Sequence, residues 1–137
     1  MRDVVTDLIR DEGFRSQAYK CPAGRLTIGY GRNIEDVGIT EEEAQHLLDN
    51  DIARVEQQLG RLYPWWIKCP GTVRRGLINM TYNLGINRLG EFKRMLACLQ
   101  AGDYKGAARE SLDSKWAEQV GDRAKRIAEL FIEAKGD

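Results

Sequence analysis

The stretch DEGFRSQAYKCPAGRLTIGYG, residues 11–31, mixes apolar, charged and turn-forming residues too finely for one regular element. The tripeptide PAG at residues 22–24 supplies a turn, because proline and glycine favour the backbone angles that turns require. After the turn, residues 25–30 (RLTIGY) alternate polar and small residues with apolar ones, which is the period-two pattern of a strand. The stretch therefore predicts short strands within residues 17–34, preceded by a helix that ends at Gly13.

Helical patterns flank this stretch on both sides. Val5, Leu8 and Ile9 predict an amphipathic helix over roughly residues 3–12. Thr40 and Glu43 form a capping box, which begins a long helix that reaches about Leu59. The chain breaks near Pro64-Trp65-Trp66. A further helix is expected from Pro70, as a first-turn proline, to about Leu84. Shorter helices are expected over roughly 91–101, 103–112 and 122–135. Gly102 would end the first of these and Asp103 would cap the next.

These elements predict an α+β fold class that is mostly α. We expect a small β-hairpin lobe, joined by one long helix to an all-helical C-terminal lobe. The 137 residues suit a single domain with its own core. The hairpin lobe with its connecting helix is expected at about 13–60 and the helical lobe at about 61–137, with the helix over 3–12 packing between or against them.

Charge and cysteine content narrow the function classes. The formal net charge is zero, which argues against a dedicated nucleic-acid binder. Residues 1–60 carry 7 Lys+Arg against 12 Asp+Glu (−5) and residues 61–137 carry 14 against 9 (+5), which suits either an anionic polymer on the C-terminal side or two lobes that attract each other. The three cysteines include no Cys-x-x-Cys pair, and His46 is the single histidine, so neither a structural zinc site nor a disulfide framework is indicated. No metal or organic cofactor is expected.

Glu12 stands in an unusual place on the first expected helix. It extends the i, i+3, i+4, i+7 pattern that Val5, Leu8 and Ile9 begin, and it lies in the last turn, where the helix dipole favours cations. Desolvation and the helix end would both favour the neutral carboxyl, an acid able to donate a proton near neutral pH. The alternative is a carboxylate in an ion pair with an arginine of the C-terminal lobe.

Cys21 and Thr27 are ambiguous when taken alone. A cysteine beside a turn is commonly a small semi-buried residue, and threonine is a good strand former. A nucleophilic pair of Cys21 with His46 is conceivable, but His46 falls in the middle of the capped helix beside two leucines, where nothing positions it.

Together these residues resemble the phage-type lysozymes (muramidases, glycoside hydrolase family 24), many of which serve as endolysins. The family's triad is a Glu, eight residues, an Asp or Cys, five residues and a Thr, and Glu12, Cys21 and Thr27 match that spacing. The frame residues DEG, YK and TIGYG match as well. In the C-terminal half the matching positions are Arg74, Arg75, Asn79, Met80, Asn83, Gly85, Phe92, Leu99, Ala107, Ala108, Trp116 and residues 123–126 (RAKR).

Several positions depart from the family pattern. Cys21 replaces the commoner Asp, and Tyr82 stands where a sugar-contacting Phe is common. The segment between the hairpin and the capped helix is short, so a small helix of longer relatives is expected to be missing. Met95 and Glu110 occupy positions where longer relatives place small polar sugar contacts, and those roles are not carried over.

The resemblance implies a lysozyme-like two-lobe fold and an endolysin that hydrolyses the β-1,4 bond between N-acetylmuramic acid and N-acetylglucosamine in bacterial peptidoglycan, causing cell-wall breakdown and host lysis. It implies that Glu12 is the general acid, with Arg123 as the charge that orients it. Cys21 and Thr27 would hold the attacking water, with inversion at the anomeric carbon. No sequence feature near Cys21 obviously lowers its pKa, so a mostly neutral thiol is expected.

The resemblance also implies substrate contacts and a cellular setting. Tyr30 and Tyr82 would face sugar rings in a cleft between the lobes, whereas Trp65, Trp66 and Trp116 are expected to be core or hinge residues. No apolar run near the N-terminus is long enough for a signal peptide or membrane anchor. A monomer in the reducing cytoplasm of the bacterial host is therefore expected before lysis. It would reach the cell wall in the periplasm with the help of a holin-like membrane-permeabilising partner.

Three alternatives to this function stay open. The first is a non-catalytic lysozyme-like protein that binds peptidoglycan or serves in a phage structure. The second is a helical DNA-binding module that uses the basic segment at 123–126, which the balanced charge disfavours. The third is a lytic transglycosylase, which would share Glu12 and the substrate but would not need Thr27 to position a water.

Overall fold

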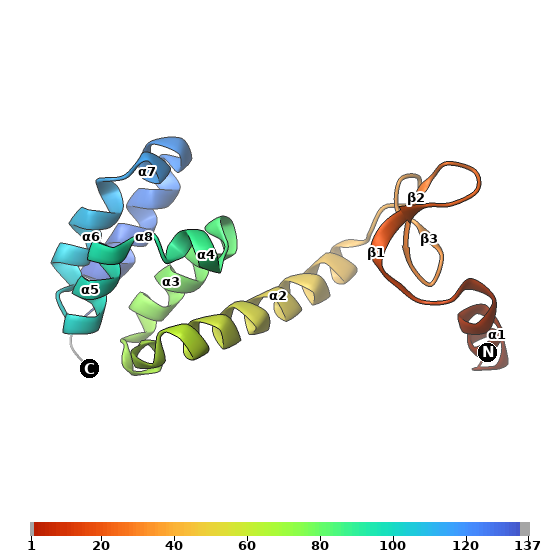
Figure 1. The fold of residues 1–137 in the computed structure, drawn as a ribbon, viewed down its shortest axis with the longest axis horizontal. Coiled ribbons are helices and arrows are strands. Elements are labelled where there is room, and N and C mark those ends of the chain that lie inside the picture. The colour runs from red at the N-terminus through yellow and green to blue at the C-terminus, as the bar shows by residue number, and fades with distance from the viewer. Residues whose placement is uncertain (1, 135–137) are drawn as a thin grey trace. The chain divides into compact units, whose positions relative to one another are not determined.

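The structure of the protein is a computed structural model, which describes residues 2–134. The chain divides into two compact units, Met1–Leu47 and Leu48–Asp137, and the boundary falls inside helix α2 (Glu41–Leu62). Figure 1 shows the order of the elements along the chain. The combination of a small antiparallel sheet with many helices confirms the α+β, mostly α, fold class and is consistent with a lysozyme-like fold.

The N-terminal unit holds helix α1 (Arg2–Glu12) and a three-stranded antiparallel sheet in the order β1-β2-β3. The strands are β1 (Arg15–Lys20), β2 (Leu26–Gly29) and β3 (Arg32–Asn33). Thr27 lies on the central strand, opposite Tyr19 of β1 and opposite Asn33 of β3. The strands that the sequence predicts within residues 17–34 are therefore present, and the first of them begins two residues earlier.

This unit has almost no hydrophobic core. Among residues 3–47, Thr27, at 3% exposure, is the only side chain that is buried. The apolar residues of α1 are exposed, at 53% for Val5, 51% for Leu8 and 42% for Ile9, because the sheet of their own unit does not cover them. The prediction that Glu12 continues a buried stripe is therefore wrong within this unit, since its side chain is exposed as well.

The C-terminal unit is helical. Helix α8 packs against α3 and α6, and α6 packs against α5, as Figure 1 shows. After α2 the elements of this unit are the 3-10 helix η1 (Pro64–Lys68), α3 (Gly71–Leu84), α4 (Ile86–Leu89), α5 (Lys93–Ala101), α6 (Tyr104–Leu112), α7 (Lys115–Val120) and α8 (Asp122–Ile132).

One continuous core holds these helices together. Phe131 of α8 and Leu77 of α3 are completely buried, and they belong to a cluster that also contains Trp66 and Trp116. Trp65 packs partly buried against the same cluster. The expectation that the three tryptophans belong to the core is therefore confirmed. Burial of this many large side chains supplies the main driving force for folding of this unit.

Local capping explains most of the helix boundaries. Gly102 ends α5 with a left-handed φ of 80°, and the Asp103 carboxylate accepts a hydrogen bond from the amide of Gly106 at 2.9 Å, which confirms the predicted cap. Pro70, predicted inside the first turn of α3, instead caps that helix from just outside it. Helices α4 and α7 were not predicted, because four and six residues are too few to show a helical period.

Two helix ends differ from the expected positions. Helix α2 continues to Leu62 instead of ending at about Leu59, and α8 ends at Ile132. The predicted end of α8 at residue 135 lies outside the described residues. Differences of a turn or less at helix ends are ordinary, since terminal turns gain and lose hydrogen bonds at little cost.

Alanine substitutions at two helical glycines should have opposite effects on stability. A Cβ at Gly76 on α3 would stand 2.7 Å from Cε1 of the buried Phe131, whereas a Cβ at Gly60 on α2 would meet Nε1 of Trp66 at an ordinary 3.5 Å. We expect Gly76→Ala to destabilise the protein by about 1–3 kcal/mol through overpacking. The matched control Gly60→Ala should stabilise it by up to about 1 kcal/mol, because alanine favours a helix. Urea unfolding measures both, and a Gly76→Ala variant as stable as the wild type would contradict this packing.

Candidate active site

A tight turn between β1 and β2 positions Cys21. The Cys21 amide donates to the carbonyl of Arg25 at 2.9 Å, and the Gly24 amide donates to the Cys21 carbonyl at 2.8 Å. Gly24 has a left-handed φ of 80°, which glycine adopts without steric cost. The Thr27 hydroxyl donates to the same Arg25 carbonyl at 2.9 Å. The turn therefore brings Cys21 and Thr27 together.

The surroundings of Cys21 lower the pKa of its thiol, chiefly through hydrogen bonds from the backbone amides of Arg25 and then Ala23, with a smaller contribution from the Thr27 hydroxyl. No obvious sequence feature predicted this lowering of the pKa, because its main cause is hydrogen bonding from the backbone. The residue types in a turn do not show that its backbone amides point at one side chain. Burial instead raises the pKa of the Cys69 thiol, and burial together with nearby carboxylates raises that of the Cys98 thiol.

Glu12 closes α1 and lies against the turn between β2 and β3. A Cβ built on Gly31 in that turn would stand 2.5 Å from Oε2 of Glu12 and 3.2 Å from its Cγ. The carboxylate therefore occupies space beside the turn that directly follows the strand carrying Thr27. The N-terminal unit thus carries Glu12, Cys21 and Thr27 on and around one small sheet.

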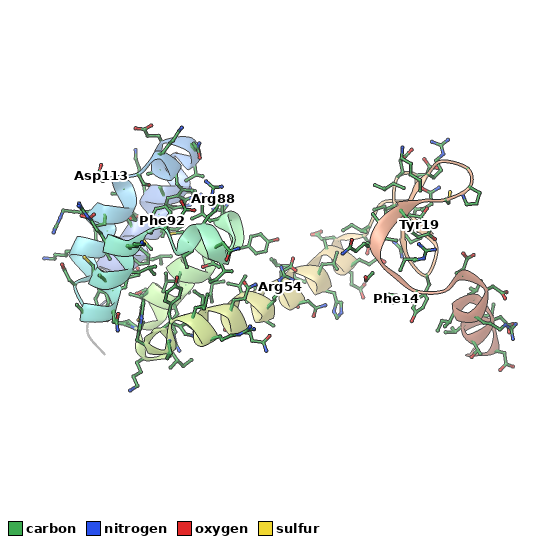
Figure 2. All side chains as sticks on the ribbon, in the orientation of Figure 1. Phe14, Tyr19, Arg54, Arg88, Phe92 and Asp113 are labelled. Atoms are coloured by element: carbon green, nitrogen blue, oxygen red, sulfur yellow. The ribbon has the colours of Figure 1, made fainter. Side chains whose placement is uncertain are left out.

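Two aromatic side chains flank this region. Tyr30 lies between Gly29 and Gly31 and is half exposed, and its ring centroid is 5.6 Å from that of Phe14, with the planes tilted by 54°. Figure 2 shows Phe14 on the segment that joins α1 to β1. Sequence reasoning selected Tyr30 but not Phe14, because one exposed phenylalanine after a glycine carries no specific signal.

A bidentate ion pair connects the sheet to the start of α2. Nη1 and Nη2 of Arg32 lie 2.8 and 2.5 Å from the two carboxylate oxygens of Glu43, and Nη1 also donates to the carbonyl of Gly38 at 3.2 Å. Glu43 in addition completes the predicted capping box, since it accepts from the Thr40 amide at 2.8 Å and its own amide donates to Oγ1 of Thr40 at 3.1 Å. The Arg32 hydrogen bonds, followed by the Thr40 amide, lower the pKa of Glu43 to about 2. Sequence reasoning identified the capping box and missed the arginine.

The helical unit holds the other predicted site residues. Arg123 of α8 donates from Nε to Oδ1 of Asn79 on α3 at 2.9 Å, and its Nη2 reaches the Asn79 carbonyl at 3.4 Å. Both residues line a hollow of about 470 Å³ together with the half-exposed Tyr82. The hollow is otherwise lined by Leu48, Ile52, Arg75 and Ile78. Arg123 and Tyr82 are therefore neighbours within this unit, and Asn79 is a partner that sequence reasoning did not select.

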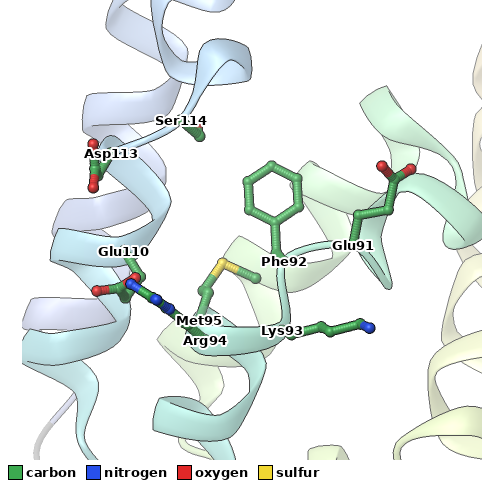
Figure 3. A pocket seen from close by; sticks show the side chains of 8 residues that line it. All are labelled: Glu91, Phe92, Lys93, Arg94, Met95, Glu110, Asp113 and Ser114. Carbon is green, nitrogen blue, oxygen red and sulfur yellow. The ribbon is translucent and has the colours of Figure 1, made fainter.

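A second hollow in the helical unit, of about 380 Å³, is lined by Met95 and Glu110, two of the positions at which the sequence departs from the family pattern (Figure 3). Met95 of α5 is buried beside it, and Glu110 of α6 lies on its rim. Its remaining lining residues are Glu91, Phe92, Lys93, Arg94, Asp113 and Ser114. A buried thioether offers little to a sugar hydroxyl, because sulfur is a weak acceptor.

Two kinds of feature are absent from residues 2–134. No group of three or more His, Cys, Asp or Glu side chains is arranged to hold a metal ion. No helix is both long enough and apolar enough to cross a membrane.

The α+β fold, with a small antiparallel sheet followed by a long helix and a helical unit, is consistent with the lysozyme class. A profile of phage lysozymes matches residues 10–130, and the chain belongs to the phage lysozyme family. It is thus a glycoside hydrolase of the endolysin type.

Three relatives illustrate the range of proteins that contain this sequence pattern. The chain is 39% identical over 114 residues to an endolysin of Acyrthosiphon pisum secondary endosymbiont phage 1, covering 79% of this chain and 73% of that protein. It is 28% identical over 153 residues to the pre-baseplate central spike protein Gp5 of Enterobacteria phage T4, covering 91% of this chain but 27% of the spike protein. It is 24% identical over 157 residues to a protein of Dictyostelium discoideum described as probable T4-type lysozyme 1, covering 93% and 92% of the two chains.

The pairing of Arg32 with Glu43 predicts a specific pH dependence of stability. Because the folded pKa of Glu43 is lowered from 4.5 to about 2, its contribution is present above the unfolded pKa and is lost as the pH falls through the folded one. Glu43→Gln should therefore be less stable than the wild type at pH 7, and the difference should shrink between pH 4.5 and about 2. Thermal unfolding across this range measures it. Glu42→Gln, which removes the same charge from the same turn but leaves the pair intact, is the control, and equal behaviour of the two variants would contradict the role of the pair.

Proposed function

We propose that Glu12, Cys21 and Thr27 carry out the hydrolysis of the β-1,4 bond between N-acetylmuramic acid and N-acetylglucosamine in peptidoglycan, with inversion at the anomeric carbon. One observation carries this proposal. The Glu12 carboxylate rests on the turn that follows β2, and the same strand bears Thr27, whose hydroxyl donates to the Arg25 carbonyl that also accepts the Cys21 amide. An acid and a polar pair that can hold water are the two components that glycoside hydrolysis needs.

Glu12 is the proposed general acid. A glycosidic oxygen is a poor leaving group, so it must receive a proton while its bond to the anomeric carbon breaks. In its own unit the Glu12 side chain is exposed. A bound glycan would exclude water from around the carboxyl group and bring it close to the glycosidic oxygen.

Cys21 and Thr27 are the proposed holders of the attacking water. Thr27 is buried, and its hydroxyl donates to the Arg25 carbonyl that also accepts the Cys21 amide, so the two residues meet at one turn, where a water can be held. The water attacks the anomeric carbon on the face opposite the leaving oxygen. Its released proton passes to solvent or to the thiolate fraction of Cys21, and that fraction grows as the pKa of the thiol falls.

The helical unit is proposed to contribute charge and sugar contacts. Arg123 is the proposed orienting charge for the Glu12 carboxylate, and Asn79 would hold the guanidinium in place through its two hydrogen bonds. Tyr30 and Tyr82 are the proposed sugar-stacking residues, since each exposes an aromatic ring. The two units would be lobes of one lysozyme domain, with the helix expected over 3–12 packing between or against them.

The cellular setting follows from the same proposal. Hydrolysis of peptidoglycan would break down the bacterial wall and lyse the host. A monomer held in the host cytoplasm would need a holin-like membrane-permeabilising protein to reach its substrate in the periplasm.

A second candidate function is structural. The relative from phage T4 is named as a spike protein, so this sequence pattern also occurs within a protein of a phage particle. A chain in that role would bind peptidoglycan without cutting it. The two functions separate in one measurement, because only an endolysin must turn over many bonds per molecule.

Glu12→Gln tests the general acid. The amide keeps the size of the side chain but has no proton to give, so hydrolysis should fall by at least about two orders of magnitude, the usual scale of acid catalysis. The measurement is turbidity clearing of purified peptidoglycan, with a pull-down to show that binding persists. Asp11→Gln, on the adjacent exposed position of α1, is the control and should retain activity.

The products of the same reaction test its chemistry. Wild-type protein should release reducing N-acetylmuramic acid ends that carry oxygen from water, initially as the α-anomer. Near wild-type clearing by Glu12→Gln would refute the acid. Release of 1,6-anhydro ends would assign the protein to the lytic transglycosylases.

Variants of Cys21 test the water-holding pair. Cys21→Asp should retain activity because a carboxylate can orient the same water, whereas Cys21→Ala should lose more activity because no polar atom remains. Iodoacetamide at pH 7 should modify Cys21 before Cys69 and Cys98 and stop hydrolysis, since the Cys21 pKa is lowered and the other two are raised. Mass spectrometry identifies the modified residue, and Cys98→Ala is the control. Full activity of Cys21→Ala would show that the thiol only fills space.

A further inference from the structure

Gly31 is the residue on which the Glu12 carboxylate rests. A Cβ on Gly31 would stand 2.5 Å from Oε2, 2.8 Å from Cδ and 3.2 Å from Cγ of Glu12, and real Cβ atoms do not approach other heavy atoms as closely as 2.5 Å. We propose that Gly31 is a positioning residue for the reaction: because it has no side chain, the Glu12 carboxylate can occupy the space where a Cβ would lie. This inference rests on the proposed role of Glu12 as the general acid.

Backbone conformation alone does not account for a steric requirement at this position. Gly29 and Gly31 flank Tyr30 and have nearly equal left-handed φ angles of 72° and 76°. A Cβ at Gly29 would meet nothing within 4 Å, whereas a Cβ at Gly31 would meet the carboxylate. Both positions therefore carry the same backbone constraint, and only Gly31 adds the contact with Glu12.

The turn between β2 and β3 is fixed by more interactions than the Glu12 side chain. Arg32, the next residue, pairs with Ile28 of β2, and its guanidinium is fixed by Glu43 and by the carbonyl of Gly38. Glu12 is exposed and has three rotatable side-chain bonds, so it can move aside at little cost. A Cβ at position 31 would thus displace the acid and leave the turn in place. Its effect should fall on catalysis more than on stability.

The experiment compares Gly31→Ala with Gly29→Ala in the full-length protein. Both variants should lose similar thermal stability, because both place alanine at a positive φ. The kcat of Gly31→Ala on soluble peptidoglycan fragments should fall at least about tenfold below that of Gly29→Ala, since a displacement of about 1 Å can cost up to about a hundredfold in rate. KM should change much less, and the limb of the pH–kcat profile that reports the acid should shift in Gly31→Ala alone.

A double variant tests whether the loss acts through Glu12. Aspartate is shorter by one methylene, so its carboxylate would stand farther from a Cβ at position 31. The fold-loss caused by Gly31→Ala should therefore be smaller in a Glu12→Asp background than in the wild type. An equal loss in both backgrounds would show that Gly31 acts on the backbone only.

The outcomes separate this inference from the proposed function. If Glu12→Gln is inactive while Gly31→Ala keeps the kcat of Gly29→Ala, the positioning role is wrong and the general acid stands. If Glu12→Gln is active, Glu12 is not the general acid, and the inference about Gly31 falls with the proposed function. If the alanine variants do not fold, Gly31→Asn and Gly29→Asn replace them, because asparagine tolerates a left-handed backbone and still carries a Cβ. The same kcat ordering is then expected, and equal kcat values overturn the proposal.

Discussion

The geometry of the N-terminal unit depends on the bidentate pairing of Arg32 with Glu43. Thr27 is the only buried side chain among residues 3–47, so this unit has no hydrophobic core to define its shape. An exposed ion pair is usually weak, but this one has two short hydrogen bonds, and it shares its carboxylate with the cap of α2. One guanidinium thereby joins β3, the loop at residue 38 and the first turn of a long helix. The turn that supports Glu12 lies directly before this arginine.

The proposed chemistry is arranged largely by the main chain. Backbone amides in the turn after β1 lower the pKa of Cys21, and the bare backbone of Gly31 leaves room for the Glu12 carboxylate. The Thr27 hydroxyl makes a smaller contribution to lowering the Cys21 pKa. A thiol in place of the commoner aspartate is consistent with this arrangement, because amides and a hydroxyl stabilise a thiolate as they would a carboxylate.

The helical unit fixes the positions of Asn79 and Arg123 through its own core. Its large core fixes α3 and α8 against each other, and these two helices carry Asn79 and Arg123. The hydrogen bonds between them set the guanidinium in a hollow beside Tyr82 before any substrate binds. The helical unit and the unit that carries Glu12 are thus built on different physical principles, burial in the first and polar contacts in the second.

Local patterns in the sequence determined the fold class, the capping box at Thr40, the Asp103 cap and the spacing of Glu12, Cys21 and Thr27, because each depends on residues a few positions apart. The tertiary structure alone decided which groups meet across longer separations. It paired Arg32 with Glu43 and Arg123 with Asn79, it left the apolar side of α1 uncovered by its own sheet, and it directed backbone amides at the Cys21 sulfur. A periodic pattern shows which face of a helix is apolar but not what covers that face. A residue type shows the atoms that a side chain offers but not the backbone groups that surround it.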